Sequence, residues 1–206
     1  MVFIHETKCS MHKIREIDNK WLIKYEYLEV KEKKLVGGIL TLRDPQNFGT
    51  LDAEASRNYL SLVCQPLGDK EIYKITNVYG TQKEKEKFKL LTSLKELKAR
   101  YPNIPSIIAG DFNMIRSLTE KKGGIRQLGR DSITFQNFIM NMGLVDTKTI
   151  NGTFTCNNKR GGLLRGTLSL RPYHDSFYSS LWRFGSLACT PQSHFYGYTK
   201  KQTFQV

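Results

Sequence analysis

The 206-residue sequence lacks several features that would assign it to particular classes of protein. No apolar run approaches the roughly 20 residues that a membrane-spanning helix needs. Residues 1–8 already contain His5, Glu6 and Lys8, which leaves no apolar core for a secretory signal. The four cysteines, at positions 9, 64, 156 and 189, form neither a Cys-x-x-Cys pair nor a zinc pattern. We therefore expect a nuclear or cytoplasmic protein with reduced cysteines that is not secreted and has no membrane partner.

Acidic residues become scarce toward the end of the chain. The net charge is +13, and residues 147–206 carry eight Lys or Arg against a single acid, Asp175. A basic protein tends to bind polyanions, and nucleic acid is the usual partner. The smaller positive excess of residues 1–146 is typical of a surface that meets a phosphate backbone. After about residue 158 no hydrophobic period is sustained, so the pattern assigns no packed role to residues 159–206.

Hydrophobic patterning predicts an α/β domain in which strands outnumber helices. Apolar, branched and aromatic residues predict strands over residues 2–4, 21–30, 35–42, 59–64, 71–79, 104–109 and 153–155. A helix is predicted over residues 82–101, with these apolar side chains facing inward: Phe88, Leu91, Leu94 and Leu97. A second helix is predicted to begin at Asp131 or Ser132 as its cap and to stop at Gly143. Its inward side chains are predicted to be Phe135, Phe138, Ile139 and Met142.

The most informative segment is residues 104–113, where an apolar run of strand length ends in Gly110 and leads into Asp111-Phe112-Asn113. Residues just past a buried strand are exposed but held in place. Asp111 and Asn113 can therefore point toward one phosphate or one metal-bound water, as a phosphoesterase requires. The plainer interpretation is that both are turn residues, because Asp and Asn are common after strands.

Other short motifs accompany this segment in a fixed order. They are Ile4-His5-Glu6-Thr7-Lys8, Gly37-Gly38-Ile39, Asn77-Val78-Tyr79-Gly80, Gly143-Leu144-Val145-Asp146 and Thr153-Phe154-Thr155. Each is weak alone, but the ordered series resembles the endonuclease/exonuclease/phosphatase superfamily, the fold of DNase I and apurinic endonucleases. Residues 111–124 are similar in particular to the endonuclease domain of plant non-LTR (long interspersed) retrotransposon polyproteins. The resemblance covers residues 1 to about 158.

This resemblance implies a DNase I-like fold, a partial four-layer α/β sandwich of two packed mixed sheets flanked by helices. It divides the chain into residues 1–158, a truncated endonuclease/exonuclease/phosphatase domain, and residues 159–206, a basic tail without family resemblance. Disorder is one expectation for that tail. The oligomeric state is left open.

The chemistry implied by the resemblance is metal-assisted hydrolysis of a phosphodiester bond in DNA. Glu6 matches the family's metal-binding Glu, for Mg²⁺ or alternatively Mn²⁺. Asp111 matches the Asp that positions or deprotonates the attacking water, and Asn113 the Asn that helps to hold water and phosphate. Tyr79 matches the Tyr whose hydroxyl contacts the scissile phosphate. The plainer interpretations are a surface acid beside Lys8 for Glu6 and half-buried sheet packing for Tyr79.

The sequence also departs from the family. A strand with a metal-site Asn is expected well before Glu6, and only five residues precede it. An Asp is expected where Leu170-Arg171-Pro172-Tyr173 stands, and a final Ser-Asp-His is replaced by Ser193-His194-Phe195. A shift of reading frame after about residue 158 would produce such a break. We therefore expect a degenerate endonuclease with weak or no hydrolysis.

Other functions stay open at this point. The chain is alternatively a non-catalytic, basic remnant that binds nucleic acid, or a product that folds poorly and has no biochemical role. A phosphatase acting on a lipid or inositol phosphate would share the fold, but the retrotransposon-like stretch over residues 111–124 favours DNA.

Overall fold

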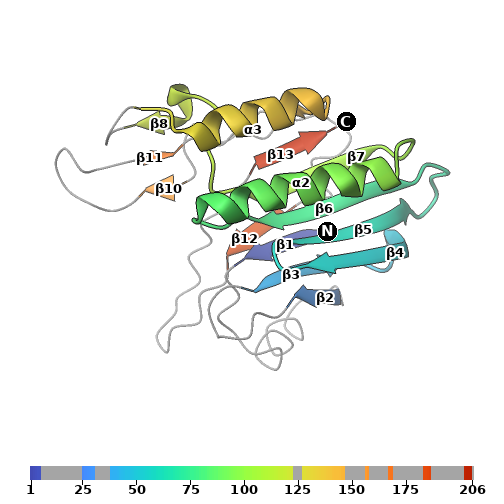
Figure 1. Ribbon diagram of the computed structural model, residues 1–206. Helices are drawn as coiled ribbons and strands as arrows, with labels where there is room; N and C mark the ends of the chain where they lie inside the picture. Colours follow the sequence, from blue (N-terminus) through green and yellow to red (C-terminus); the bar gives the residue numbers. More distant parts are fainter. Residues whose placement is uncertain are drawn as a thin grey trace, which may run out of the picture.

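The computed structural model describes residues 1–5, 25–30, 38–122, 127–146, 156–157, 167–168, 183–186 and 202–205. These residues form two large sheets packed against each other, with helices α2 and α3 on the outside of one of them (Figure 1). The predicted α/β fold with two packed sheets and flanking helices is confirmed. Among the described residues no helix is both long and apolar enough to cross a membrane.

The larger sheet contains six described strands in the order β4-β5-β6-β7-β13-β9. Their bounds are Phe48–Ser56 for β4, Tyr59–Pro66 for β5, Tyr73–Tyr79 for β6, Ser106–Asp111 for β7, Gln202–Gln205 for β13 and Val145–Asp146 for β9. Strands β6 and β7 are parallel, and the other pairs are antiparallel. The parallel pair is joined by α2, Glu84–Arg100, which crosses one face of the sheet.

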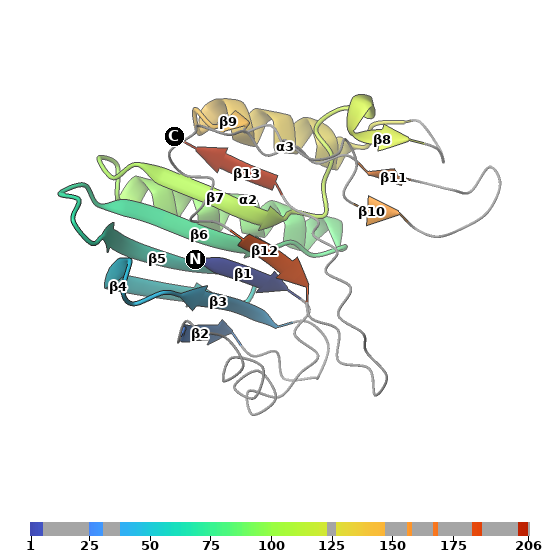
Figure 2. The same cartoon turned by 180° about the vertical axis from the view of Figure 1, so that it is seen from behind.

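The second sheet has the order β12-β1-β3-β2 and lies against the other face of the larger sheet (Figure 2). Its strands are Arg183–Ser186 for β12, Val2–His5 for β1, Ile39–Arg43 for β3 and Glu26–Val30 for β2. A small third sheet has the order β10-β11-β8. Its strands are Cys156–Asn157 for β10, Thr167–Leu168 for β11 and Lys121–Lys122 for β8. Strand β8 directly follows a 3-10 helix, η1, at Leu118–Glu120.

Alternation along the strands separates two apolar clusters. One lies between the sheets and contains Phe3, Leu62, Cys64, Ile75 and Ala109 among its members. The other lies under the helices and is built from residues of β6, β7, α2 and α3, the last spanning Arg130–Asn141. Burying each large aliphatic side chain of this kind is worth about 1.5–3 kcal/mol relative to exposure. Both faces of the larger sheet are therefore anchored, which holds the ends of β6 and β7 rigidly.

Helix α2 departs from the prediction in one respect. Leu91, Leu94 and Leu97 are buried as predicted, but Phe88 is 62% exposed. Phe88 and Leu97 are nine residues apart, about two and a half turns at 3.6 residues per turn, so they point in opposite directions. Leu90 takes the inward position that the prediction gave to Phe88, and that part of the prediction was wrong.

Helix α3 begins earlier than predicted. Its cap position is Gly129, with no side-chain hydrogen bond, so neither Asp131 nor Ser132 caps it. The Asp131 carboxylate instead accepts a hydrogen bond from the backbone N–H of Ser132 within the first turn. Phe135, Phe138 and Ile139 are buried and Met142 packs against the same cluster, as predicted, and Gly143 ends the helix with a φ of 62°.

The predicted strands correspond to β1, β2, β3, β5, β6 and β7, whereas β4 and the short strands β8 to β13 were not predicted. Strand β4 was not predicted, because most of its side chains are exposed and its alternating apolar residues are mostly small, as at Ala53 and Ala55. It is the edge strand of the larger sheet, where such a polar sequence discourages pairing with other chains. Residues 21–24, 35–37 and 153–155 of the predicted strands lie outside the described residues. Short parts of the segment after residue 158 form β11, β12 and β13, and the proposed division into 1–158 and 159–206 stays a prediction.

One buried cation ties α2 to the sheet. Lys74, on β6, is 1% exposed, and its Nζ donates a hydrogen bond of 2.8 Å to the carbonyl of Leu97 near the end of α2. The same ammonium lies 5.1 Å from the centre of the Tyr101 ring. Burial lowers the pKa of Lys74 from 10.5 to about 8, and the nearby positive charges of Lys98 and Arg100 act in the same direction.

Candidate active site

The candidate site lies at the carboxyl ends of the parallel strands β6 and β7. Tyr79, the last residue of β6, pairs in register with Asp111, the last residue of β7. Carboxyl ends of adjacent parallel strands meet at one edge of a sheet, a common place for ligand sites in α/β proteins. The sequence predicted Asp111 just past a strand, and the structure makes it the final strand residue, 9% exposed.

Two glycines allow the strand ends to approach this closely. A Cβ at Gly110, which has a φ of 148°, would lie 1.9 Å from the carbonyl oxygen of Val78. A Cβ at Gly80 would lie 2.1 Å from the carbonyl oxygen of Phe112. Contacts this short are impossible for any side chain. The backbone N–H of Gly80 donates to the carbonyl of Asp111 at 2.5 Å, which fastens the two ends together.

Asn113 is held in place by hydrogen bonds on both sides of its amide. Its backbone N–H donates to Oδ1 of Asp111 at 2.9 Å, and its φ of 52° is in the left-handed region that Asn tolerates. Its Nδ2 donates to the carbonyl of Gly80 at 2.6 Å, and its Oδ1 accepts from Nε2 of Gln82 at 3.0 Å. Asp111 and Asn113 are therefore fixed relative to each other and to the end of β6.

Tyr79 is half-buried and is fixed through both its backbone and its ring. Its N–H donates to the carbonyl of Asn58 at 2.8 Å, and its carbonyl accepts from Nδ2 of Asn58 at 2.9 Å. Its ring stacks on the imidazole of His5, with 5.5 Å between ring centres and 17° between planes. The structure thus brings Tyr79, Asp111 and Asn113 to one edge of the sheet.

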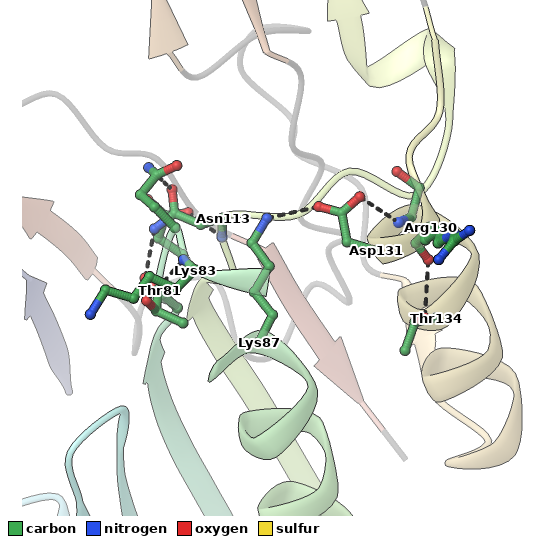
Figure 3. A network of polar contacts seen from close by, with 11 residues as sticks. Thr81, Lys83, Lys87, Asn113, Arg130, Asp131 and Thr134 are labelled. Carbon is green, nitrogen blue, oxygen red and sulfur yellow. Dashed lines mark hydrogen bonds and ion pairs between the residues drawn. The ribbon is translucent and has the colours of Figure 1, made fainter. Parts of the chain in front are cut away.

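Helix α2 begins beside Asn113, and its first turn is fixed by further polar contacts (Figure 3). The hydroxyl of Thr81 accepts from the N–H of Lys83 at 3.2 Å and donates to Glu86 at 3.0 Å. The side chain of Lys87, 11% exposed, forms an ion pair of 2.7 Å with Asp131 of α3. Figure 3 shows Lys87 reaching across from α2 to Asp131, so both helices are linked next to the site.

The segment after Asn113 is also fastened from several sides. Glu120 is buried, and its carboxylate accepts the backbone N–H of Arg116 at 2.7 Å. The carbonyl of Arg116 accepts from Nε2 of Gln136 on α3 at 2.6 Å. These bonds give residues 114–120 one defined path away from the site.

Comparison of the sequence with models of known protein families and with curated proteins gives no match. Comparison of the structure with solved structures does give matches. An endonuclease/exonuclease/phosphatase family protein from Bacteroides thetaiotaomicron superposes with a TM-score of 0.51 at 13% identity, over 78% of this chain and 64% of that one. This chain thus spans slightly less than two thirds of that protein's length.

Two further structures are similar over more of the chain. The human Nocturnin catalytic domain with bound sulfate gives a TM-score of 0.58 at 11% identity, over 98% of this chain and 78% of that one. The endonuclease domain of TRAS1, a telomere-specific non-LTR retrotransposon, gives 0.52 at 10% identity, over 88% and 78%. The chain has the DNase I-like α/β fold that these structures share. At such low identities the likeness establishes the fold and leaves the activity to be argued from the site.

The donors available at this site are of the type that a hard cation prefers. Tyr79, Asp111 and Asn113 present hydroxyl, carboxylate and amide oxygens, and Mg²⁺ binds oxygen ligands. Among the described residues no group of three or more His, Cys, Asp or Glu could hold a metal. Glu6, the predicted metal ligand, lies outside the described residues and directly follows His5, the last residue of β1. The donor set is compatible with Mg²⁺, and the role of Glu6 as a metal ligand stays a prediction.

Basic side chains flank the site on the side of α2. Arg57 and Lys83 are 63% and 75% exposed, and both lie near Glu86, at 3.9 Å and 3.3 Å. Arg57 precedes Asn58, which holds the backbone of Tyr79. A hydrogen bond from Thr81, together with one from Lys83, lowers the pKa of Glu86. Two exposed cations therefore share one carboxylate, which leaves a net positive charge at the start of α2.

Sequence reasoning missed the residues that hold the predicted ones, chiefly His5, Asn58, Asn77 and Gln82. His5 and Asn77 lie inside motifs already singled out, and both are polar residues next to apolar residues of a strand. That anomaly is the signal that could have found them, because buried polar groups require partners.

Proposed function

We propose that this chain is a metal-dependent phosphodiester hydrolase of the retrotransposon endonuclease type, which nicks DNA with low activity. The observation that carries the proposal is the pairing of Tyr79 with Asp111 at the ends of two parallel strands, with Asn113 fixed beside them. One phosphate at this edge can meet a carboxylate, an amide and a phenol together. Such an enzyme would act in the nucleus or the cytoplasm.

Asp111, Asn113 and Tyr79 have distinct roles in this proposal, and the Asn113 side chain helps to hold the water and the phosphate. The Asp111 carboxylate orients the attacking water and takes its proton, and the backbone N–H of Asn113 holds that carboxylate by its Oδ1. As the water oxygen bonds to phosphorus, the bond to the leaving oxygen breaks, and that oxygen takes up a proton from solvent. The Tyr79 hydroxyl donates a hydrogen bond to the phosphoryl oxygen on which negative charge grows. Glu6 would hold Mg²⁺, which supplies charge neutralisation at the phosphate when bound.

DNA is proposed as the substrate for two reasons. Residues 111–124 resemble retrotransposon endonucleases, and one solved structure with this fold is the endonuclease domain of a non-LTR retrotransposon. Arg57 and Lys83 also provide positive charge on the side of α2, where the backbone of a nucleic acid strand would pass.

Low activity is proposed because the chain departs from the family at two motifs that are expected to help stabilise charge on the phosphate. The expected Ser-Asp-His is replaced by Ser193-His194-Phe195, which lies outside the described residues, as does Leu170-Arg171-Pro172-Tyr173. Removing one donor to a developing oxyanion costs about 2.7–4 kcal/mol, a factor of about 10²–10³ in rate. Hydrolysis should therefore be slow but still depend on Asp111.

The test is conversion of supercoiled plasmid to nicked circles by the full chain in Mg²⁺. Asp111→Asn should reduce the rate to the level seen in EDTA. Asp69→Asn is the matched control, since Asp69 is exposed in the turn before β6, at the opposite end of that strand. The proposal fails if Asp111→Asn nicks as fast as the unchanged protein.

The second candidate, a nucleic-acid-binding remnant without catalysis, is favoured by the exposed cations Arg57 and Lys83. It predicts DNA binding that weakens steeply with salt and survives Asp111→Asn. Binding of this kind without any nicking dependent on Asp111 would establish the remnant. Binding independent of salt would exclude it.

A further inference from the structure

A buried His5–Asn77 pair joins the two sheets next to Tyr79. His5 is 4% exposed and Asn77 is fully buried. They lie on β1 and β6, in different sheets, and are separated by 72 positions in the sequence. Asn77 and Tyr79 are two residues apart on β6, so strand alternation directs both side chains to the face that meets β1 and β3.

The hydrogen bonds of Asn77 determine which way its amide faces. Its Nδ2 donates to the carbonyl of Leu40 at 3.2 Å and to the hydroxyl of Thr41 at 3.1 Å. A backbone carbonyl can only accept, so the NH₂ group must lie on that side. Oδ1 therefore faces His5, at 2.5 Å from its Nε2, and that nitrogen must carry the hydrogen. The chain itself thus selects one tautomer and one ring orientation for His5.

The oriented imidazole is the surface on which the Tyr79 ring rests. The two rings are nearly parallel, 17° apart, with 5.5 Å between centres. A phenol carries its hydroxyl at the far end of the side chain, so a small tilt of the ring displaces that hydroxyl by about 1 Å, and a misplacement of this size can cost about 10²-fold in rate. The orientation of the Tyr79 ring plane therefore determines the position of its hydroxyl.

We propose that His5 and Asn77 are positioning residues for Tyr79. Asn77 fixes the imidazole, and the imidazole fixes the phenol ring at the phosphate site. Because His5 ends β1, the same pair also anchors the point from which the chain continues into Glu6. This inference rests on the proposed function, in which the Tyr79 hydroxyl contacts the scissile phosphate.

Two variants of His5 distinguish a role in positioning Tyr79 from a purely structural role, in which His5 only provides a hydrogen bond to the buried Asn77. His5→Gln keeps a donor that can reach Oδ1 of Asn77 but removes the ring. His5→Phe keeps a ring against Tyr79 but leaves Oδ1 of Asn77 without this donor, which should destabilise the fold. The positioning role predicts that His5→Gln lowers kcat about 10- to 100-fold while KM on a short duplex stays within about twofold. A purely structural role predicts the reverse order, with His5→Gln normal and His5→Phe impaired only in stability.

A readout independent of activity is provided by the NMR signals of the Tyr79 ring, assigned by their loss in Tyr79→Phe. The proposal expects these signals to shift and broaden in His5→Gln, and expects the His5 ring of the unchanged chain to show a protonated Nε2. Unchanged Tyr79 signals in a folded His5→Gln protein would overturn it. If the unchanged chain nicks no DNA, the proposed function falls, and the ring signals alone then decide whether His5 positions Tyr79.

Discussion

Replacing the buried Lys74 with Met should stabilise the protein near neutral pH and change how its stability depends on pH. A fall of the pKa from 10.5 to about 8 corresponds to about 3 kcal/mol, because each pKa unit is worth about 1.4 kcal/mol. Met fills similar space without a charge. It loses the bond to the Leu97 carbonyl, which costs about 1 kcal/mol. The expected net gain for Lys74→Met is about 2 kcal/mol at pH 7.

The sign of the pH effect follows from where the proton is held. Between pH 8 and 10.5 the unfolded chain keeps the Lys74 proton while the folded chain releases it, so the unfolded state binds more protons. The stability of the unchanged protein therefore rises with pH across this window. Below pH 8 both states are protonated, and the folded state carries the full desolvation cost.

The assay is urea unfolding followed by circular dichroism at several pH values from 7 to 10.5. The advantage of Lys74→Met over the unchanged chain should be largest at pH 7 and should shrink by about 3 kcal/mol toward pH 10.5. Lys95→Met, at an exposed position of α2, is the matched control and should show a difference that does not vary with pH. A constant difference for Lys74→Met as well would refute the reasoning.

Two further predictions concern the strand ends and helix α2. Gly110→Ala should lower the free energy of unfolding by more than about 3 kcal/mol or prevent folding, because its Cβ would meet the Val78 carbonyl at 1.9 Å. Gly143→Ala should lower it by only about 1 kcal/mol, because Gly143 has a φ of 62° but no atom lies within 4 Å of the added Cβ. Equal unfolding midpoints in urea for the two variants would contradict the close approach of β6 and β7. Leu94→Ala should destabilise the protein by about 2–5 kcal/mol, and Phe88→Ser should change its stability by less than about 0.5 kcal/mol. A large loss of stability with Phe88→Ser would contradict the exposed position of the Phe88 ring.

The sequence contained enough information to predict both described helices and the strands β1, β2, β3, β5, β6 and β7, because their hydrophobic patterns are local. It also placed Tyr79, Asp111 and Asn113 in motifs at the ends of elements. Phe88 was assigned wrongly because a constant spacing of three residues drifts to the opposite face of a helix by Leu97, whereas Leu90, Leu94 and Leu97 keep the helical spacing. In β4 the alternating apolar residues Leu51, Ala53 and Ala55 are mostly small and exposed, so the pairing with β5 is what defines this strand.

The supports of the site could not be predicted, because they depend on contacts between distant residues. The His5–Asn77 bond joins residues 72 positions apart and requires the two sheets to be packed in register. The bond between Gln82 and Asn113 likewise depends on the helix that separates β6 from β7 in the sequence. Glu6 stays a predicted metal ligand, since it lies outside the described residues.

The central claim is that Asp111 activates water for attack on a phosphodiester bond, and cleavage in ¹⁸O-labelled water tests it most directly. A short duplex would be incubated with excess full-length protein and Mg²⁺, and the phosphate-bearing product examined by mass spectrometry. The account predicts that ¹⁸O appears on that phosphate at equal rates for the unchanged chain and Asp69→Asn, and at the rate without protein for Asp111→Asn. Equal labelling by Asp111→Asn and the unchanged chain, or no labelling by either, would contradict it.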